Sequence, residues 1–191
     1  MIQLGITIPT ALLSALGKWT SRSMPHIGAV VIRGQNLMAC DGHRLAVVPH
    51  IQVGQAPSFG VMNDDIDKIV AVAAVLKAPM LDFLLKEDRL QVSIGPAVVM
   101  DVRARSASEY PVSDGWERLL LPKKRGRPVP TVAINPALFG AMSEVEAAIP
   151  SSTPVEDRYV TLESWGGKLD GVVFNGHAGA TYMIMPVNYK P

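Results

Sequence analysis

The strongest constraint on the fold is a pattern of secondary-structure signals that recurs three times along the 191 residues. Each copy contains a short apolar strand, an amphipathic helix and three further strands, and successive copies are spaced by roughly 60 residues. Glycine, proline, asparagine and acidic residues separate the strands. An amphipathic helix must bury its apolar face, and here the neighbouring strands supply the surface. The pattern therefore predicts an α+β fold made of three repeated helix-plus-antiparallel-sheet units.

The helices of the three copies have recognisable starts. The first is expected to begin at Pro9 and to carry apolar side chains as far as Trp19. Asn63 is the expected N-cap of the second, which runs to about Lys77, and Pro136 lies in the first turn of the third. The predicted strands are 4–8, 27–33, 37–40 and 45–48 in the first copy, 59–62, 80–86, 89–94 and 97–103 in the second, and 132–134, 159–164, 168–174 and 181–186 in the third.

The domain organisation follows from this repeat. Residues 1–115 are expected to form one complete domain from two units, 1–55 and 56–115. Residues 116–130 form a basic, proline-containing linker, and residues 131–191 form half of a second domain. The chain is thus expected to hold about one and a half domains.

Composition excludes several kinds of protein. A net charge of +1 is too small for a chain that coats nucleic acid, so any DNA contact must come from local basic patches. A single cysteine, Cys40, rules out an internal disulfide and suits a reducing compartment. The longest apolar run, 69–76, is too short to span a bilayer, and no signal peptide is recognisable. These features predict a soluble cytoplasmic protein with no membrane partner.

The densest polar chemistry lies at Asp41-Gly42-His43-Arg44, between two apolar strands. One interpretation is a tight hairpin corner, since Gly42 permits a turn and Asp41 can cap its own backbone. A catalytic pair of Cys40 and His43 is disfavoured, because their spacing along a strand does not bring thiol and imidazole together. The histidines lack a recognised metal-ligand spacing. We therefore expect neither an enzyme nor a cofactor or metal.

Three segments resemble the bacterial DNA polymerase III beta sliding clamp. The segment 39–46 is similar to the Ala-Thr-Asp-Gly-His-Arg-Leu-Ala of the family's middle domain, with Cys40 in place of threonine. The segment 182–187 resembles the Tyr-Val-Val-Met-Pro-Met at the family's chain end. The segments 109–111 and 118–122 are similar to the family's link between its middle and last domains, with extra residues between them. The resemblance implies the DNA-clamp, or processivity-factor, fold.

The resemblance also implies a hydrophobic pocket for short linear peptides of a DNA polymerase, a clamp loader or repair proteins. Methionine, leucine and proline would give an adaptable apolar slot, and His43 and Arg44 would give it a polar rim. A core strand is the alternative for Met183 and Met185. Carried over by position, the pocket residues are Gly42, His43, Arg44, Leu45, Pro111, Arg118, Leu119, Met183, Met185, Pro186 and Val187.

The family encircles double-stranded DNA with a ring of twelve units whose helices contact phosphates. Here the first helix would offer Lys18 and Arg22, and the second Lys68 and Lys77, whereas the third carries glutamates. Since three units from each of four chains make twelve, the resemblance leads us to expect a head-to-tail homotetramer.

The basic linker is a further candidate DNA contact. Its centre, Lys123-Lys124-Arg125-Gly126-Arg127-Pro128, contains an Arg-Gly-Arg-Pro that resembles an AT-hook core for the minor groove. A solvated loop is the alternative. For the whole chain, the alternatives to a processivity factor are a clamp-fold protein that acts without a ring, as a decoy or cap for clamp-binding partners, and a minor-groove DNA-binding protein.

Overall fold

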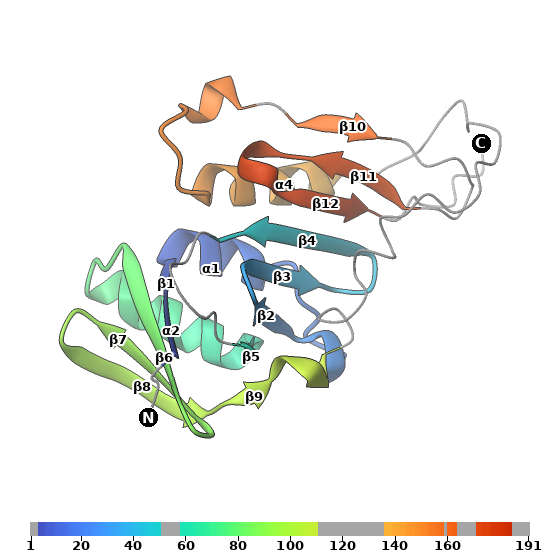
Figure 1. Cartoon of the computed structure of the whole chain (residues 1–191). Helices are drawn as coiled ribbons and strands as arrows, with labels where there is room; N and C mark the ends of the chain where they lie inside the picture. The colour runs from blue at the N-terminus through green and yellow to red at the C-terminus, as the bar shows by residue number, and fades with distance from the viewer. Residues whose placement is uncertain (1–3, 51–57, 111–135, 159, 164–170, 185–191) are drawn as a thin grey trace.

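The structure, a computed structural model, describes residues 4–50, 58–110, 136–158, 160–163 and 171–184 (Figure 1). It confirms the α+β architecture of three helix-plus-sheet units. Within these residues no helix is long and apolar enough to cross a membrane. The predicted strand 132–134 lies outside the described residues.

Each unit contains one α-helix followed by three strands, and unit 2 adds a fourth strand of two residues. Unit 1 (residues 4–50) consists of β1 (Leu4–Pro9), α1 (Thr10–Gly17), the 3-10 turn η1 (Pro25–Ile27), β2 (Ala29–Arg33), β3 (Asn36–Cys40) and β4 (Arg44–Pro49). Unit 2 (58–110) consists of β5 (Ser58–Met62), α2 (Asn63–Val75), β6 (Met80–Lys86), β7 (Arg89–Ile94), β8 (Ala97–Arg103), β9 (Arg105–Ser106) and η2 (Ala107–Glu109). Unit 3 (the described residues from 136 to 184) consists of α4 (Pro136–Ala148), η4 (Val155–Asp157), β10 (Thr161–Glu163), β11 (Val172–Asn175), η5 (His177–Gly179) and β12 (Thr181–Ile184).

Units 1 and 2 are joined because each gives its first strand to the other. β1 pairs antiparallel with β6, which places Ile6 opposite Phe83 in the four-stranded sheet β1-β6-β7-β8. In the same way β5 pairs with β2, which places Val61 opposite Val30. All four of these side chains are buried. Because each sheet contains a strand of the other unit, neither unit has a complete sheet by itself.

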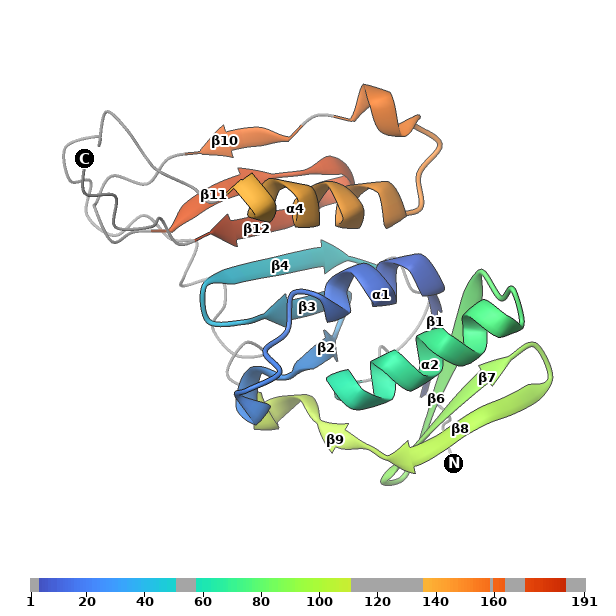
Figure 2. The same ribbon diagram turned by 180° about the vertical axis from the view of Figure 1, so that it is seen from behind.

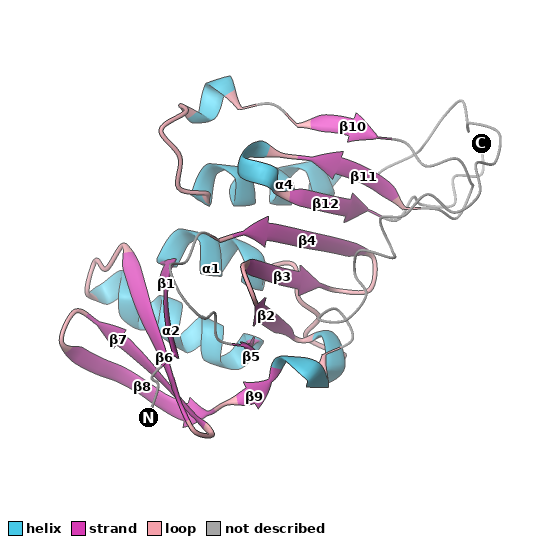
Figure 3. Cartoon of the chain, viewed as in Figure 1, coloured by secondary structure: helices cyan, strands magenta, loops and turns pink. Residues whose placement is uncertain are grey.

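Unit 3 extends the sheet of unit 1. β12 pairs antiparallel with β4, and Tyr182 lies opposite Ala46. The result is an eight-stranded sheet in the order β10-β11-β12-β4-β3-β2-β5-β9. The helices α4, α1 and α2 follow one another along one side of the strands, as Figure 2 shows, and Figure 3 separates them by colour from the strands. The chain is therefore a row of units in the spatial order 2, 1, 3.

The helices and the strands enclose one main core. α1 contributes Leu12, Leu13 and Leu16 to it, and Trp19, just beyond the helix, is completely buried. A smaller cluster lies on the other face of the eight-stranded sheet, where Tyr110 covers Val31 and Met38. The outer face is thus partly apolar around β2, β3 and β4.

The expected role of Asn63 as an N-cap is wrong. Asn63 is the first residue of α2 and its side chain is buried, whereas Met62 occupies the cap position without a side-chain hydrogen bond. The Asn63 amide donates to the Ser21 carbonyl at 2.8 Å, and its side-chain oxygen contacts the Thr20 hydroxyl. Asn63 therefore ties the loop after α1 to the start of α2, a long-range contact that local helix signals do not reveal.

The close approach of Tyr110 to Gly60 generates a stability prediction. A methyl group added at Gly60 would overlap the Tyr110 ring, which is buried and whose hydroxyl contacts the Met62 sulfur at 3.1 Å. We expect Gly60→Ala to lower the free energy of unfolding by about 1–3 kcal/mol, as overpacking does. Urea unfolding followed by circular dichroism measures the change.

Gly140→Ala in α4 is the matched control. A methyl group there meets no atom within 4 Å, and alanine is the better helix former, so stability should rise by roughly 0.5–1 kcal/mol. Equal stabilities of the Gly60→Ala variant and the wild type would contradict the observed packing of Tyr110.

Candidate functional site

The turn that begins β4 is capped by its own aspartate. Asp41 Oδ1 accepts hydrogen bonds from the backbone N–H groups of His43 and Arg44, both at 3.0 Å. Gly42 adopts a φ of +91°, which favours glycine. Gly42 and His43 are exposed at this corner. The hairpin corner and the proposed peptide contact are therefore compatible, since the turn fixes the backbone and leaves the His43 ring available.

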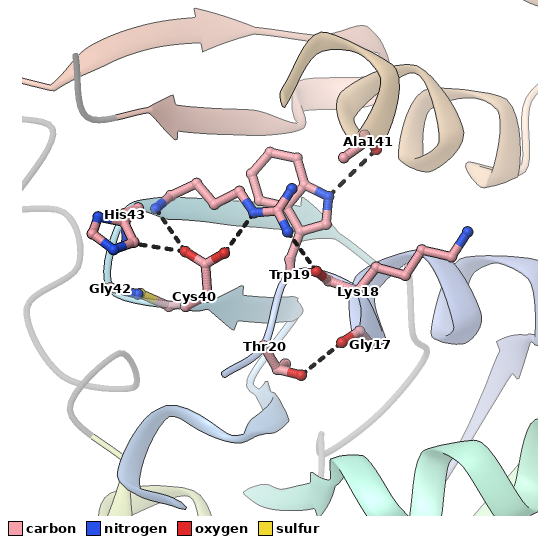
Figure 4. A network of polar contacts seen from close by, with 10 residues as sticks. Gly17, Lys18, Trp19, Thr20, Cys40, Gly42, His43 and Ala141 are labelled. Carbon is pink, nitrogen blue, oxygen red and sulfur yellow. Dashed lines mark hydrogen bonds and ion pairs between the residues drawn. The ribbon is translucent and has the colours of Figure 1, made fainter. Parts of the chain in front are cut away.

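The Arg44 side chain packs within unit 1 against Trp19, the residue that contacts unit 3. Its Nε donates to Asp41 Oδ2 at 2.7 Å, and another guanidinium nitrogen donates to the Lys18 carbonyl at 2.6 Å. The guanidinium carbon lies 4.9 Å from the ring centroid of Trp19, a cation–π distance. Trp19 in turn donates to the Ala141 carbonyl of α4 at 3.3 Å (Figure 4). With its side chain only 15% exposed, Arg44 is a structural residue, and little of it is left for a pocket rim.

Two of the residues expected to line the pocket meet across the β4–β12 pairing. Met183 lies directly opposite Leu45, although the two are far apart in the sequence. Leu45 is buried in the outer-face cluster, and Met183 is half-buried against it. Pro111, Arg118, Leu119, Met185, Pro186 and Val187 lie outside the described residues. The structure therefore places part of the predicted pocket together without testing peptide binding.

Met24 and Ile27 adjoin the same corner, although no sequence pattern marks them as its neighbours. A methyl group built on Gly42 would lie 3.5 Å from the Met24 Cε and from the Ile27 Cδ1. Met24 is exposed, and Ile27 is half-buried in η1. The only sequence signal was an isolated methionine before a proline, which carries no information about its neighbours. These two residues enlarge the apolar surface around His43.

The described residues also form a groove elsewhere. It has a volume of about 630 Å³ and lies over β1, β6 and β7, where Gly5 leaves room opposite Leu84. Thr7 donates to Asp82 at 2.6 Å within it, and burial lowers the pKa of His50 at its edge. The groove lies in unit 2's sheet, away from the β4–β12 junction.

Of the four basic residues expected on the first two helices, Lys68 alone lies within one, because α1 ends before Lys18 and Arg22 and α2 ends before Lys77. Three of the four are paired with acidic residues. Lys18 contacts Glu144 at 2.6 Å, Arg22 contacts Asp67 at 2.9 Å, and Lys68 contacts Asp65 at 3.5 Å. Lys77 is exposed just after α2 in a left-handed conformation, with a φ of +51°. The linker cations Lys123, Lys124, Arg125 and Arg127 lie outside the described residues. The helix surface therefore has mixed charge, which weakens its attraction for phosphates.

The two glutamates of α4 have different positions. Glu144 is exposed and pairs with Lys18, whereas Glu146 is buried. Glu146 accepts from the Tyr182 hydroxyl at 2.7 Å and from the His177 N–H at 3.2 Å. Burial, and then the bond to Glu146, raise the pKa of Tyr182 well above its ordinary value. Glu146 is therefore a core residue, and only Glu144 adds negative charge to the helix surface.

The pKa of the Cys40 thiol is shifted in the opposite direction to that of a catalytic nucleophile. Burial raises its pKa, and the Gly42 N–H lies 3.4 Å from the sulfur. An activated thiol needs a lowered pKa. The described residues also contain no group of three or more histidine, cysteine, aspartate or glutamate side chains that could hold a metal.

Solved structures with the same fold are DNA polymerase III beta sliding clamps. The beta subunit of Thermotoga maritima superposes with a TM-score of 0.60 at 12% identity, over 99% of this chain and 65% of that one. A Pseudomonas aeruginosa sliding clamp with a ligand gives 0.60 at 13% identity, over 98% and 66%. The Borrelia burgdorferi beta subunit in complex with a natural product gives 0.54 at 10% identity, over 98% and 65%. The chain thus spans slightly less than two thirds of the length of these clamps.

These comparisons confirm the clamp fold predicted from the sequence. At such low identity they establish the fold and leave the activity open. No protein-family model matches the sequence, and the curated protein sequences compared with it contain no significant relative.

The buried Glu146 generates a second stability prediction. In Glu146→Gln, one of the two carboxylate acceptors becomes an amide donor facing the His177 N–H or the Tyr182 hydroxyl. We expect the free energy of unfolding to fall by about 1–3 kcal/mol, the cost of a poorly satisfied buried polar group. Chemical denaturation at neutral pH measures it.

Glu144→Gln is the control for charge alone, because it removes the same charge from an exposed ion pair. Its effect should stay within about 1 kcal/mol. If the two variants lose equal stability, Glu146 does not have the core role assigned to it.

Proposed function

We propose that the protein is a sliding-clamp-like processivity factor that tethers DNA polymerase or repair proteins to double-stranded DNA. The observation that carries the proposal is the row of helices α4, α1 and α2 on one side of a sheet that continues from unit 1 into unit 3. The fold similarity to beta sliding clamps supports it. Such a protein retains DNA by enclosing it, and needs no sequence-specific contact.

The mixed charge of the helices fits retention by enclosure better than tight binding. Lys18, Arg22 and Lys68 are paired with carboxylates, so each must exchange partners before it contacts a phosphate. Few lasting phosphate contacts imply weak, salt-sensitive affinity for open duplex. Since each chain contributes three units, a ring of twelve requires four chains.

The partner-binding site in this proposal is the corner at β4 and β12. Met183, Met24 and Ile27 supply apolar surface, the buried Leu45 supports Met183 from below, and the exposed His43 supplies a polar contact for an extended peptide. The remaining residues that the clamp resemblance assigns to the pocket follow in the chain after Tyr110 and after Ile184.

A second candidate is a clamp-fold protein that binds clamp partners without enclosing DNA, as a decoy or cap. The paired charges of the helix surface favour it, because they leave little net positive potential for DNA. Both candidates use the same peptide site, so assembly on DNA distinguishes them.

Threading on DNA tests the first candidate. We expect the protein to remain on a linear biotinylated duplex when streptavidin blocks both ends after mixing, and to leave the same duplex when its ends stay open. A duplex blocked before mixing should retain little protein, because a closed ring cannot pass its ends. Gel filtration in moderate salt separates bound from free protein. Equal binding in all three cases would contradict enclosure and favour simple surface binding.

The basic linker is tested by the direct affinity of the protein for duplex DNA, with the threading assay as the control. If the segment Arg125–Pro128 binds the minor groove, the double variant Arg125→Ala, Arg127→Ala should weaken direct affinity for AT-rich duplex more than for mixed sequence. Threading should persist in that variant. Unchanged affinity on both duplexes would remove the minor-groove contact and leave the clamp proposal intact.

The peptide site is tested at Met183. We expect Met183→Ala to weaken binding of clamp-binding peptides of about ten residues by roughly fivefold to thirtyfold, because an apolar contact of about 1–2 kcal/mol is lost. Fluorescence anisotropy with labelled peptides measures the affinity. Met80→Ala is the matched control, since Met80 is an exposed methionine on the other sheet. Equal affinities of the two variants would place the peptide elsewhere.

A further inference from the structure

The units of this chain meet through two different kinds of junction. At the exchange junction, between units 1 and 2, each unit gives its first strand to the other, so that β1 lies beside β6 and β5 beside β2. At the edge junction, between units 1 and 3, the last strands β4 and β12 pair antiparallel, and α1 packs against α4. Each unit therefore has one exchange side and one edge side.

The edge side of unit 2 is open within the described residues. β8, the last strand of the four-stranded sheet, pairs with β7 on one side and with no described strand on the other. Val98 on β8 is 56% exposed and Val75 on the neighbouring α2 is 81% exposed, with Val72 and Leu76 exposed beside it. A sheet edge flanked by exposed apolar side chains invites pairing with another chain. We call β8 with Val72, Val75 and Leu76 the unit 2 face.

The exchange side of unit 3 is open in the same sense. β10 occupies in unit 3 the place that β2 occupies in unit 1. β2 is flanked by the exchanged strand β5, whereas β10 pairs only with β11 among the described strands. Leu162 on β10 is 62% exposed, and Phe139 on α4 is exposed as well. We call β10 with Leu162 and Phe139 the unit 3 face. The two faces lie at opposite ends of the row of units (Figure 1).

The two faces are of different kinds, so they do not complement each other. An edge side pairs with an edge side, as β4 pairs with β12, and an exchange side needs another exchange side. In the chain, the edge sides of units 1 and 3 already occupy each other, and so do the exchange sides of units 1 and 2. Among the described strands, the edge side that lacks a neighbour belongs to unit 2 and the exchange side that lacks one belongs to unit 3. By this pairing rule, each is complemented by the same face of a second copy.

We infer that copies of this chain associate like face with like face, β8 with β8 and unit 3 with unit 3, through two-fold symmetric interfaces. This order differs from the head-to-tail order expected from the sequence. In a ring of four chains, the β8 interface and the unit 3 interface would alternate. Four chains of three units would then close a ring of twelve units. The closed ring of twelve units rests on the proposed function. The rule that like faces pair depends only on the two faces.

Blocking one face at a time separates the two orders of assembly. Val98→Asp places a charge on the unit 2 face, and Leu162→Asp places one on the unit 3 face; both side chains are exposed, so the fold should persist. With like-face pairing, each single variant still associates through its intact face and stops at a dimer, and the double variant is a monomer. With head-to-tail pairing, either single variant is already a monomer. Sedimentation equilibrium gives the mass in multiples of the 20.5 kDa chain.

Val155→Asp is the control, because it puts the same charge on an exposed valine in η4, outside both faces, and should leave the wild-type mass unchanged. Monomeric single variants beside a tetrameric wild type, or a wild type that is itself monomeric at micromolar concentration, would overturn the inference. Association that follows the like-face rule without threading on DNA would instead contradict the proposed function and leave the pairing rule standing.

Discussion

The pairing of β4 with β12 joins unit 3 to the rest of the molecule. It turns two separate sheets into one of eight strands, and it brings Met183 to Leu45 across the junction. Behind it, Trp19 is buried between the Arg44 guanidinium and the Tyr182 ring, whose centroid lies 5.6 Å away. Hydrogen bonds alone add modestly to stability, so the buried aromatic residues supply much of what holds unit 3 in place.

The same junction gives several charged residues structural roles. Arg44 fixes the turn at Asp41 and covers Trp19, and Glu146 satisfies the Tyr182 hydroxyl. Lys18 joins unit 1 to unit 3 through Glu144. In the function proposed for this protein, DNA is held by enclosure, which does not depend on a dense row of free cations. The low net charge of the chain is consistent with that mode of retention.

Much of the local structure could be predicted from the sequence. Helical periodicity located α1, α2 and α4, and alternation with turn residues located β6, β7 and β8 with the observed bounds. Asn63 was misassigned because its partners, Ser21 and Thr20, lie in another unit. Of the expected pocket, the sequence motif selected Leu45 and Met183, but it missed Met24 and Ile27, which approach Gly42 only after η1 folds back onto the turn.

The number of units, the position of each helix and the glycine turn before β4 depend on residues that are neighbours in the chain, so the amino-acid pattern predicts them. Which strands are exchanged, and which edges of the described sheets are covered, depends on contacts between distant residues and is seen only in the folded chain. Strand pairing is a contact between backbones, and any two edges of suitable shape can make it, so the side-chain pattern does not name the partner. Within the part of the chain that the structure describes, the open edges of β8 and β10 follow from the neighbours that β1, β5, β4 and β12 have in the sheets.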